Sequence, residues 1–133
     1  MVWRGVLSTA SDQNVLIGFS AGGTGGFADG NNLISFRVSG TGNIIGVCDS
    51  GGTETTRDSG VTPDGSTQHT LRIEVSSNGT IVKFFVDDAQ VGADVTTNIP
   101  SGATALTAVC GIRNSAAANK EMWTWDWYGW REV

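Results

Sequence analysis

The feature that most constrains the fold is a pair of alternating runs on either side of an Asn-Gly dipeptide. Residues 71–75 and 82–86 each place Leu, Ile, Val or Phe at every second position, and Asn78-Gly79 lies between them. A period of two sends alternate side chains to opposite faces of a strand, and Asn-Gly accommodates the positive backbone angles of a tight turn. The sequence therefore predicts an antiparallel hairpin over residues 69–87, joined at Asn78-Gly79.

Similar short runs recur along the chain, each bounded by Gly, Asn, Asp or Ser. They occupy residues 2–8, 14–20, 33–39, 43–48, 53–58, 89–95, 105–113 and 121–131. The 19 glycines and two prolines suit many tight turns, and the apolar spacing of a helix is almost absent. We therefore predict an all-β, antiparallel two-sheet sandwich of about ten strands.

Length and charge limit the kinds of partner that the chain is expected to have. A length of 133 residues and a net charge of −5 fit a single acidic domain spanning residues 1–133. The eight Lys and Arg residues form no basic stripe, so we expect no nucleic-acid partner. Because no long apolar run is present, we expect no membrane association either.

The two cysteines, Cys48 and Cys110, each lie inside an apolar run. Neither has a His, Cys or Asp at the spacing of a metal site, and His69 is the only histidine, which argues against zinc. Two interpretations stay open for the cysteines. They are either two buried thiols that act as small apolar residues or the two halves of a disulfide.

Five segments together resemble a known family, the concanavalin A-like lectin/glucanase domains. Residues 68–75 and 80–91 look like the HTLRIEV and FYVDG strands of the family's hairpin, and residues 97–100 and 111–114 continue the similarity in order. Residues 52–56 resemble variants that are embedded in phage virion proteins. The resemblance implies a jelly-roll sandwich of two curved antiparallel sheets.

The N-terminal part departs from the family. Members usually begin with strands that pair with the final strand, whereas residues 3–8 correspond to the second or third strand of the usual fold. The expectation is therefore a sheet edge left open at the start of the chain, and an open edge invites pairing with another chain. The chain is then either a compact minimal version or receives a strand from a neighbouring subunit.

Catalysis requires residues that the sequence does not bring together. Retaining glycosidases use two carboxyl groups about 5 Å apart, which residues two positions apart on one strand supply. The acidic residues considered for such a pair lie in a turn, alone on a strand or six positions apart: Asp87-Asp88, Glu74, and Asp126 with Glu132. His69 has no identified partner for a Ser-His-Asp site. We therefore expect no enzyme activity and no catalytic residue.

Two further segments are candidates for bound ligands. Residues 22–26 are rich in glycine but lack the Lys-Ser/Thr pair of a phosphate-binding loop, so we expect a surface loop there. The resemblance to lectins raises the possibility of calcium at Asp87, Asp88 and Asp94, but no calcium loop of fixed spacing is present. We therefore expect no metal and no cofactor.

Four of the five tryptophans lie in residues 122–130. Strand geometry places Trp123, Trp125 and Trp127 on one face, and the resemblance places that face inward. Indole rings suit core packing, subunit contacts or stacking on sugars. We expect the interface or glycan-stacking residues to be Trp3, Tyr128 and Trp130.

Two functions follow as hypotheses. The first is a virion structural protein, either a capsid decoration (auxiliary) protein or a head/tail fibre module, which binds capsid or tail proteins and its own copies. It would be located in the virion after synthesis in the host cytoplasm, and we expect a homo-oligomer, most plausibly a trimer. The second is a lectin-like module that binds a glycan without cleaving it.

Overall fold

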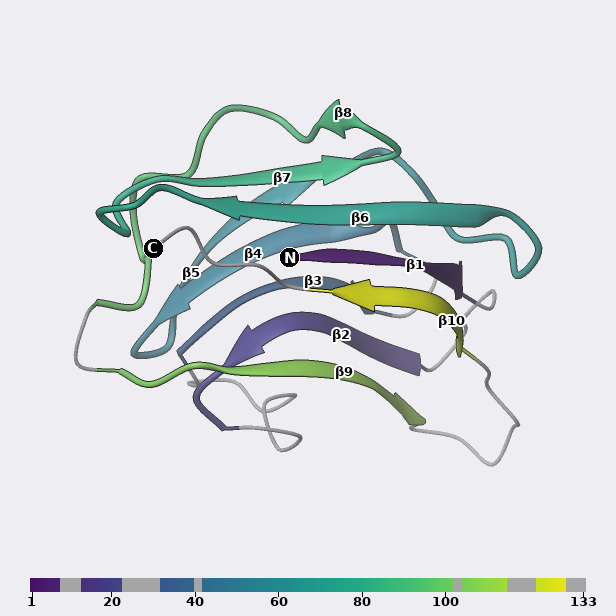
Figure 1. The fold of residues 1–133 in the computed structure, drawn as a ribbon, viewed down its shortest axis with the longest axis horizontal. Coiled ribbons are helices and arrows are strands. Elements are labelled where there is room, and N and C mark those ends of the chain that lie inside the picture. The colour runs from purple at the N-terminus through teal and green to yellow at the C-terminus, as the bar shows by residue number, and fades with distance from the viewer. Residues whose placement is uncertain (8–12, 23–31, 40–41, 102–103, 115–121, 129–133) are drawn as a thin grey trace.

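The structure is a computed structural model that describes residues 1–7, 13–22, 32–39, 42–101, 104–114 and 122–128 (Figure 1). Its strands form two antiparallel sheets, here named sheet A and sheet B. Sheet A consists, in spatial order, of β10 (Met122–Tyr128), β1 (Val2–Leu7), β6 (Gln68–Val75), β7 (Val82–Val86) and β8 (Ala89–Gln90). Sheet B consists of β5 (Thr53–Asp58), β4 (Ile45–Ser50), β3 (Leu33–Ser39), β2 (Gln13–Ser20) and β9 (Thr107–Asn114). The predicted all-β architecture with two antiparallel sheets is confirmed for the described residues.

The strands lie close to the predicted runs, with one main exception. The run predicted at residues 89–95 is a strand only at Ala89 and Gln90. Beyond these two residues, Val95 forms an isolated antiparallel bridge with Val82. The segment therefore leaves the sheet edge after β8 and returns to it at one position.

The predicted hairpin is present, but its turn differs from the predicted one. β6 pairs with β7 in antiparallel register, with Ile73 opposite Phe84. Only Gly79 of the Asn-Gly pair has a positive φ, at 70°, and the backbone N of Ser76 donates to the carbonyl of Ile81 at 2.9 Å. The strands are therefore joined at Asn78-Gly79 as predicted, but through a loop over residues 76–81 that is wider than a two-residue turn.

A tight turn of that type instead joins β7 to β8. Asp87 and Asp88 both have positive φ, at 51° and 65°, and Val86 pairs with Ala89 on either side of them. Two positive φ angles are typical of the type I′ hairpin turn, which most often contains Asn or Gly. The short polar side chain of Asp also tolerates this conformation.

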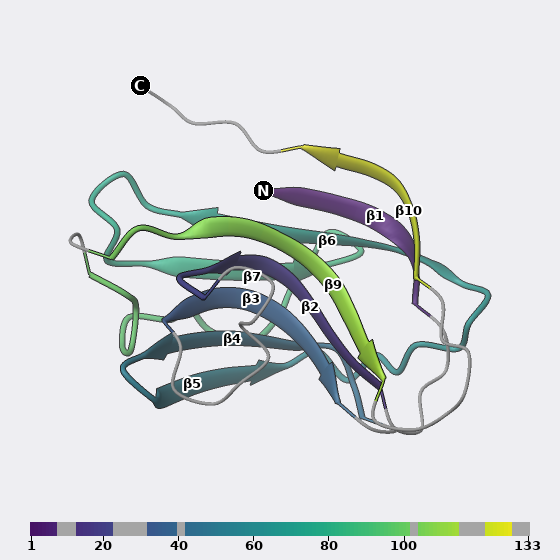
Figure 2. The same ribbon diagram turned by 90° about the horizontal axis from the view of Figure 1, so that it is seen from below.

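The main core lies between the two sheets, which Figure 2 shows as two layers. Its buried side chains come from both sheets, among them Trp3, Leu71, Ile73 and Phe84 from sheet A and Val15, Ile17, Ile34, Phe36 and Cys48 from sheet B. These residues occupy alternate positions of their strands, so that they share the face of each sheet that is turned to the other sheet. The two sheets therefore form a β-sandwich around one shared core.

Phe84 of sheet A packs against two residues of sheet B. Its ring meets that of Phe36 edge to face, with centroids 5.2 Å apart and planes at 74°. A Cβ atom added to Gly46 would lie 2.4 Å from Cγ of Phe84. Gly46 therefore leaves the space in sheet B that the Phe84 ring from sheet A fills.

The position of β1 corrects the expectation of an open edge at the start of the chain. β1 pairs with β6 on one side and with the final strand, β10, on the other. The first strand is therefore an inner strand of sheet A, and the final strand is the edge. The first and last strands complete the sheet together, although their sequences are far apart.

The space at Gly46 predicts the effect of one added methyl group. Gly46→Ala should lower the free energy of unfolding by about 1–3 kcal/mol, because the methyl overlaps the Phe84 ring and forces the sheets to shift. Urea denaturation followed by circular dichroism measures this loss.

The matched control is a double-mutant cycle. In a Phe84→Leu background the ring is absent, so Gly46→Ala should cost less there than in the wild type. An equal cost in both backgrounds would show that Phe84 does not determine the requirement for glycine at position 46.

Candidate functional site

One long side of the sandwich is covered by the segment that follows β8. Val95 of this segment exchanges two backbone hydrogen bonds with Val82 of sheet A, at 2.8 and 2.9 Å. Arg57 of β5, at the edge of sheet B, donates from Nε to the carbonyl of Ala93 at 2.8 Å. Residues 91–98 therefore contact both sheets, and we name this the closed side.

The opposite side ends in β9 of sheet B and β10 of sheet A (Figure 2). Within the described ranges, β9 pairs only with β2 and β10 only with β1. The two edge strands meet where Sγ of Cys110 lies 3.9 Å from Sδ of Met122. We name this pair of edge strands the open side.

The two sides differ in how their edge strands are protected. Edge strands of soluble proteins are usually short, covered, or marked by Lys, Pro or other charges, since a bare edge pairs with other chains. On the closed side β8 has two residues, and β5 has the sequence TETTRD with three charged residues. On the open side β9 (TAVCGIRN) and β10 (MWTWDWY) have eight and seven residues, contain no Lys or Pro, and have one charged residue each, Arg113 and Asp126. The open side therefore has long edges with little protection.

Trp3, one of the expected contact residues, lies in the core. It is 0% exposed, and its Nε1 donates to Oγ1 of Thr124 at 3.1 Å across the β1–β10 pair. This burial corrects the expectation for Trp3, because a side chain that packs inside the sandwich offers no face to a glycan or a partner.

The other expected contact residues are placed only in part. Tyr128 lies opposite Val2 in the β1–β10 register, while its side chain and all of Trp130 lie outside the described part of the chain. The side chains of Trp123, Trp125 and Trp127 are likewise outside it, so their predicted common inward face stays a prediction.

A register shift between Arg4 and Gly5 interrupts the β1–β10 pairing. On the two sides of the shift, Trp127 lies opposite Trp3, and Trp123 lies opposite Val6. The regular two-residue alternation of a strand is therefore broken at this point of the β1–β10 pairing. This irregularity is a β-bulge or a related feature, which the sequence pattern did not predict.

Both cysteines are free thiols, so the disulfide alternative is not formed in this structure. Burial raises the pKa of the Cys48 thiol to about 12 and also raises the pKa of the half-buried Cys110. Because the thiolate is the nucleophile and the metal ligand, the raised pKa disfavours the reactive form of both groups at neutral pH. The interpretation as buried thiols that act as small apolar residues is supported for Cys48, which belongs to the main core.

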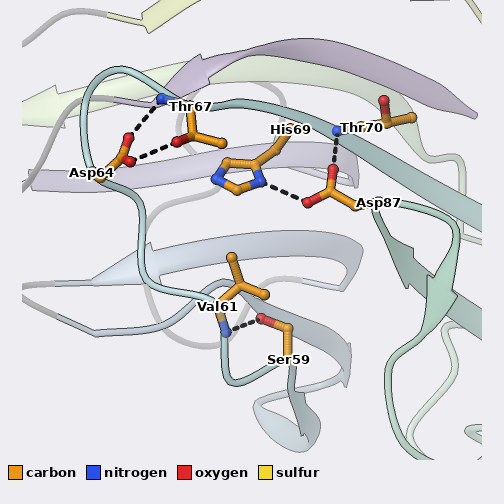
Figure 3. Close-up of polar contacts among 7 residues, drawn as sticks. All are labelled: Ser59, Val61, Asp64, Thr67, His69, Thr70 and Asp87. Atoms are coloured by element: carbon orange, nitrogen blue, oxygen red, sulfur yellow. Dashed lines mark hydrogen bonds and ion pairs between the residues drawn. The ribbon is translucent and has the colours of Figure 1, made fainter.

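His69 has the partner that the sequence did not reveal (Figure 3). Its side chain is buried, and Nδ1 lies 2.8 Å from Oδ2 of Asp87 in the β7–β8 turn. The other carboxylate oxygen of Asp87 accepts a hydrogen bond from the backbone N of Thr70 at 2.8 Å. The statement that His69 lacks a partner is therefore wrong, and the pair ties the turn to the start of β6.

The hydroxyl groups of Ser59 and Thr67 form hydrogen bonds with residues other than His69. The Thr67 hydroxyl donates to Oδ2 of Asp64, and Oγ of Ser59 accepts from the backbone N of Val61 (Figure 3). Neither hydroxyl has a hydrogen bond to His69 among the described contacts. The arrangement therefore holds a turn in place and lacks the Ser–His contact of a nucleophilic site.

An open cleft of about 530 Å³ lies at the end of the β6–β7 hairpin. Its lining consists of uncharged residues, most of them with hydroxyl or amide groups: Ser77, Asn78, Gly79, Thr80, Thr96, Asn98, Ile99, Pro100 and Ser101. Hydroxyl and amide groups hydrogen-bond to neutral polar ligands. Across the described part of the chain, no three His, Cys, Asp or Glu residues are grouped as a metal site would require.

Comparison with known proteins gives no family assignment. No protein-family model matches the chain, and no curated protein matches its sequence. No helix in the described ranges is long and apolar enough to cross a membrane. Functional inference for this chain therefore rests on its sequence and its geometry.

Asp64 is an exposed carboxylate that organises the connection before β6. It accepts hydrogen bonds from the Thr67 hydroxyl at 2.5 Å and from the backbone N of Thr67 and Ser66 at 2.6 and 2.8 Å. These donors, the Thr67 hydroxyl first, hold the pKa of Asp64 far below its ordinary value of 3.8. The charged form is therefore favoured in the folded chain.

This lowered pKa predicts a dependence of stability on pH. A carboxylate with a lowered pKa stabilises the fold above its ordinary pKa, and the contribution is lost as the pH falls through the folded-state pKa. Asp64→Asn should therefore be less stable than the wild type near neutral pH, and the difference should shrink below pH 3.8. Urea midpoints measured across acid pH test this, with Asp88→Asn as the control for the loss of one exposed charge. A difference that is the same at every pH would contradict it.

Proposed function

We propose that this chain is a non-catalytic structural module of a virion that binds capsid or tail proteins and its own copies through the open side. The observation that supports this proposal is the contrast between the two sides of the sandwich. The closed side is covered by residues 91–98, whereas the edges of β9 and β10 are long and lack Lys and Pro. A partner strand or surface would cover these edges.

The likeness of the β6–β7 hairpin to concanavalin A-like domains of phage virion proteins supports the virion assignment. The arrangement of two antiparallel sheets around one core supports the finer proposal of a jelly-roll fold. We place the chain in the virion as a capsid decoration protein or a head/tail fibre module. A homotrimer is the assembly proposed for it.

One observation favours a second function, the binding of a glycan. The cleft at residues 77–80 and 96–101 is uncharged and lined largely by hydroxyl and amide groups, which suit the hydroxyl groups of a sugar. No aromatic side chain is among the lining residues, so a stacking surface is missing there. We therefore place glycan binding second to assembly.

The assembly proposal predicts the effect of a charge placed on the open side. Ala108 is an exposed residue of the edge strand β9, and Ala108→Lys should weaken self-association at least about tenfold, or about 1.4 kcal/mol, because lysine on an edge opposes strand pairing. Sedimentation equilibrium measures the association.

The matched control is Thr56→Lys, at an exposed position of β5 on the closed side. It adds the same charge and should leave association unchanged, with far-ultraviolet circular dichroism of both variants like that of the wild type. A monomeric wild type at high concentration that also fails to bind any viral shell would remove the structural proposal. Glycan binding by that monomer, weakened by Thr96→Lys in the cleft, would favour the second function.

The non-catalytic assignment is tested on polysaccharides. Purified protein incubated with laminarin, agarose, carrageenan or xylan should release no reducing ends, because the proposal gives the chain no pair of carboxyl groups that act together on a glycosidic bond. The assay measures reducing sugar over time, with an active glucanase as the positive control. Robust cleavage that Glu74→Gln abolishes would overturn the assignment.

A further inference from the structure

The loop between β6 and β7 holds the side-chain carbonyl of Asn78 in an unusual set of contacts. Oδ1 of Asn78 accepts hydrogen bonds from Oγ of Ser76 at 2.7 Å, from Oγ1 of Thr80 at 2.8 Å and from the backbone N of Thr80 at 3.3 Å. Among the described contacts its Nδ2 has no partner, and the residue is exposed. Three donors thus point at one oxygen while the amide nitrogen faces solvent.

Donors in this position favour attack on the amide carbon. When a nucleophile adds to a carbonyl carbon, negative charge develops on the oxygen, and fixed hydrogen-bond donors stabilise that charge. They also draw electrons from the carbon in the ground state. The Ser76 and Thr80 groups therefore occupy the positions of oxyanion donors for Cγ of Asn78.

The nucleophile in reach along the chain is the backbone N of Gly79. Bonding of this atom to Cγ of Asn78 closes a five-membered ring, and Asn78-Gly79 is the single Asn-Gly pair of the sequence. A Cβ added to Gly79 would have nothing within 4 Å, so the space beside the Gly79 Cα is open. The attack requires Gly79 to release one hydrogen bond, from its N–H to the carbonyl of Ser76 at 2.8 Å.

We propose that Asn78 is a site of spontaneous deamidation in the folded chain. The bond between the Gly79 nitrogen and Cγ of Asn78 forms, and the bond between Cγ and Nδ2 breaks. The proton of the Gly79 N–H passes through water to Nδ2, which leaves as ammonia, and the product is a succinimide. Water then opens the ring at one of its two carbonyl carbons and gives aspartate or isoaspartate, so that one water is consumed and one ammonia is released.

The reaction changes two parts of the molecule. Residues 77–80 form one wall of the uncharged cleft, and the product places a carboxylate there. The isoaspartate product also adds one methylene to the main chain in the loop between β6 and β7, the hairpin that carries Phe84. The site is independent of the open side, so it goes beyond the proposed assembly function.

The experiment incubates the full folded chain at mildly alkaline pH and follows proteolytic peptides by mass spectrometry. The peptide with Asn78 should gain the mass that marks replacement of NH2 by OH, and an isoaspartyl methyltransferase should label it. Asn43 and Asn98, which both precede isoleucine, serve as internal controls and should convert far more slowly. No conversion of Asn78, under conditions in which a synthetic peptide of residues 74–84 converts, would overturn the proposal.

A variant separates activation from simple exposure. Thr80→Val removes the hydroxyl donor to Oδ1 and leaves the contacts of Ser76 in place, so it should slow conversion by roughly threefold to tenfold, the equivalent of one exposed hydrogen bond. Thr96→Val, at a lining residue of the cleft that has no described hydrogen bond to Asn78, should leave the rate unchanged. An unchanged or faster rate in Thr80→Val would show that the contacts protect Asn78, and it would overturn the proposal.

Discussion

The contact between Phe84 and the backbone at Gly46 sets how the two sheets meet. An aromatic ring from one sheet fits against the other because one position there has no side chain, and Phe36 meets the same ring edge to face. Interiors packed at crystal-like density transmit such a constraint to their neighbours. The β6–β7 pair presents Phe84, and the β3–β4 pair presents Phe36 and Gly46. The two strand pairs are therefore coupled through one point of the core.

Alternation predicted the strands well because it is a local property of the chain. Leu71, Ile73 and residues 82, 84 and 86 lie buried at the alternate spacing that the sequence predicted, whereas Val75 at the end of its strand is exposed. The position of the turn at Asn78-Gly79 was predicted, but the width of its loop was not, because the Ser76 hydroxyl accepts a hydrogen bond from the backbone N of Ile81 and supports the loop over residues 76–81. The turn predicted at Asp87-Asp88 is confirmed, but its two positive φ angles were not predicted, because the segment contains no glycine.

The candidate sites depend on contacts between distant residues, and for this reason sequence reasoning reached them only in part. Asp87 in the β7–β8 turn binds His69 of β6. Trp3 is buried where the final strand lies beside the first. Neither relation follows from a local period or from spacing along the chain. The free state of Cys48 was among the interpretations left open, since an apolar strand is the usual setting of a buried thiol.

The pairing of β1 with β10 has a consequence for the order in which the molecule is completed. Contacts of large sequence separation form late, because closing a long loop costs entropy before the contact repays it. During synthesis, β1 can pair with β6 well before residues 122–128 leave the ribosome. Until that moment the other edge of β1 is unpaired and the Trp3 indole lacks the Thr124 hydroxyl. The interval between these two events is when a nascent chain is most exposed to pairing with a neighbour at the same edge.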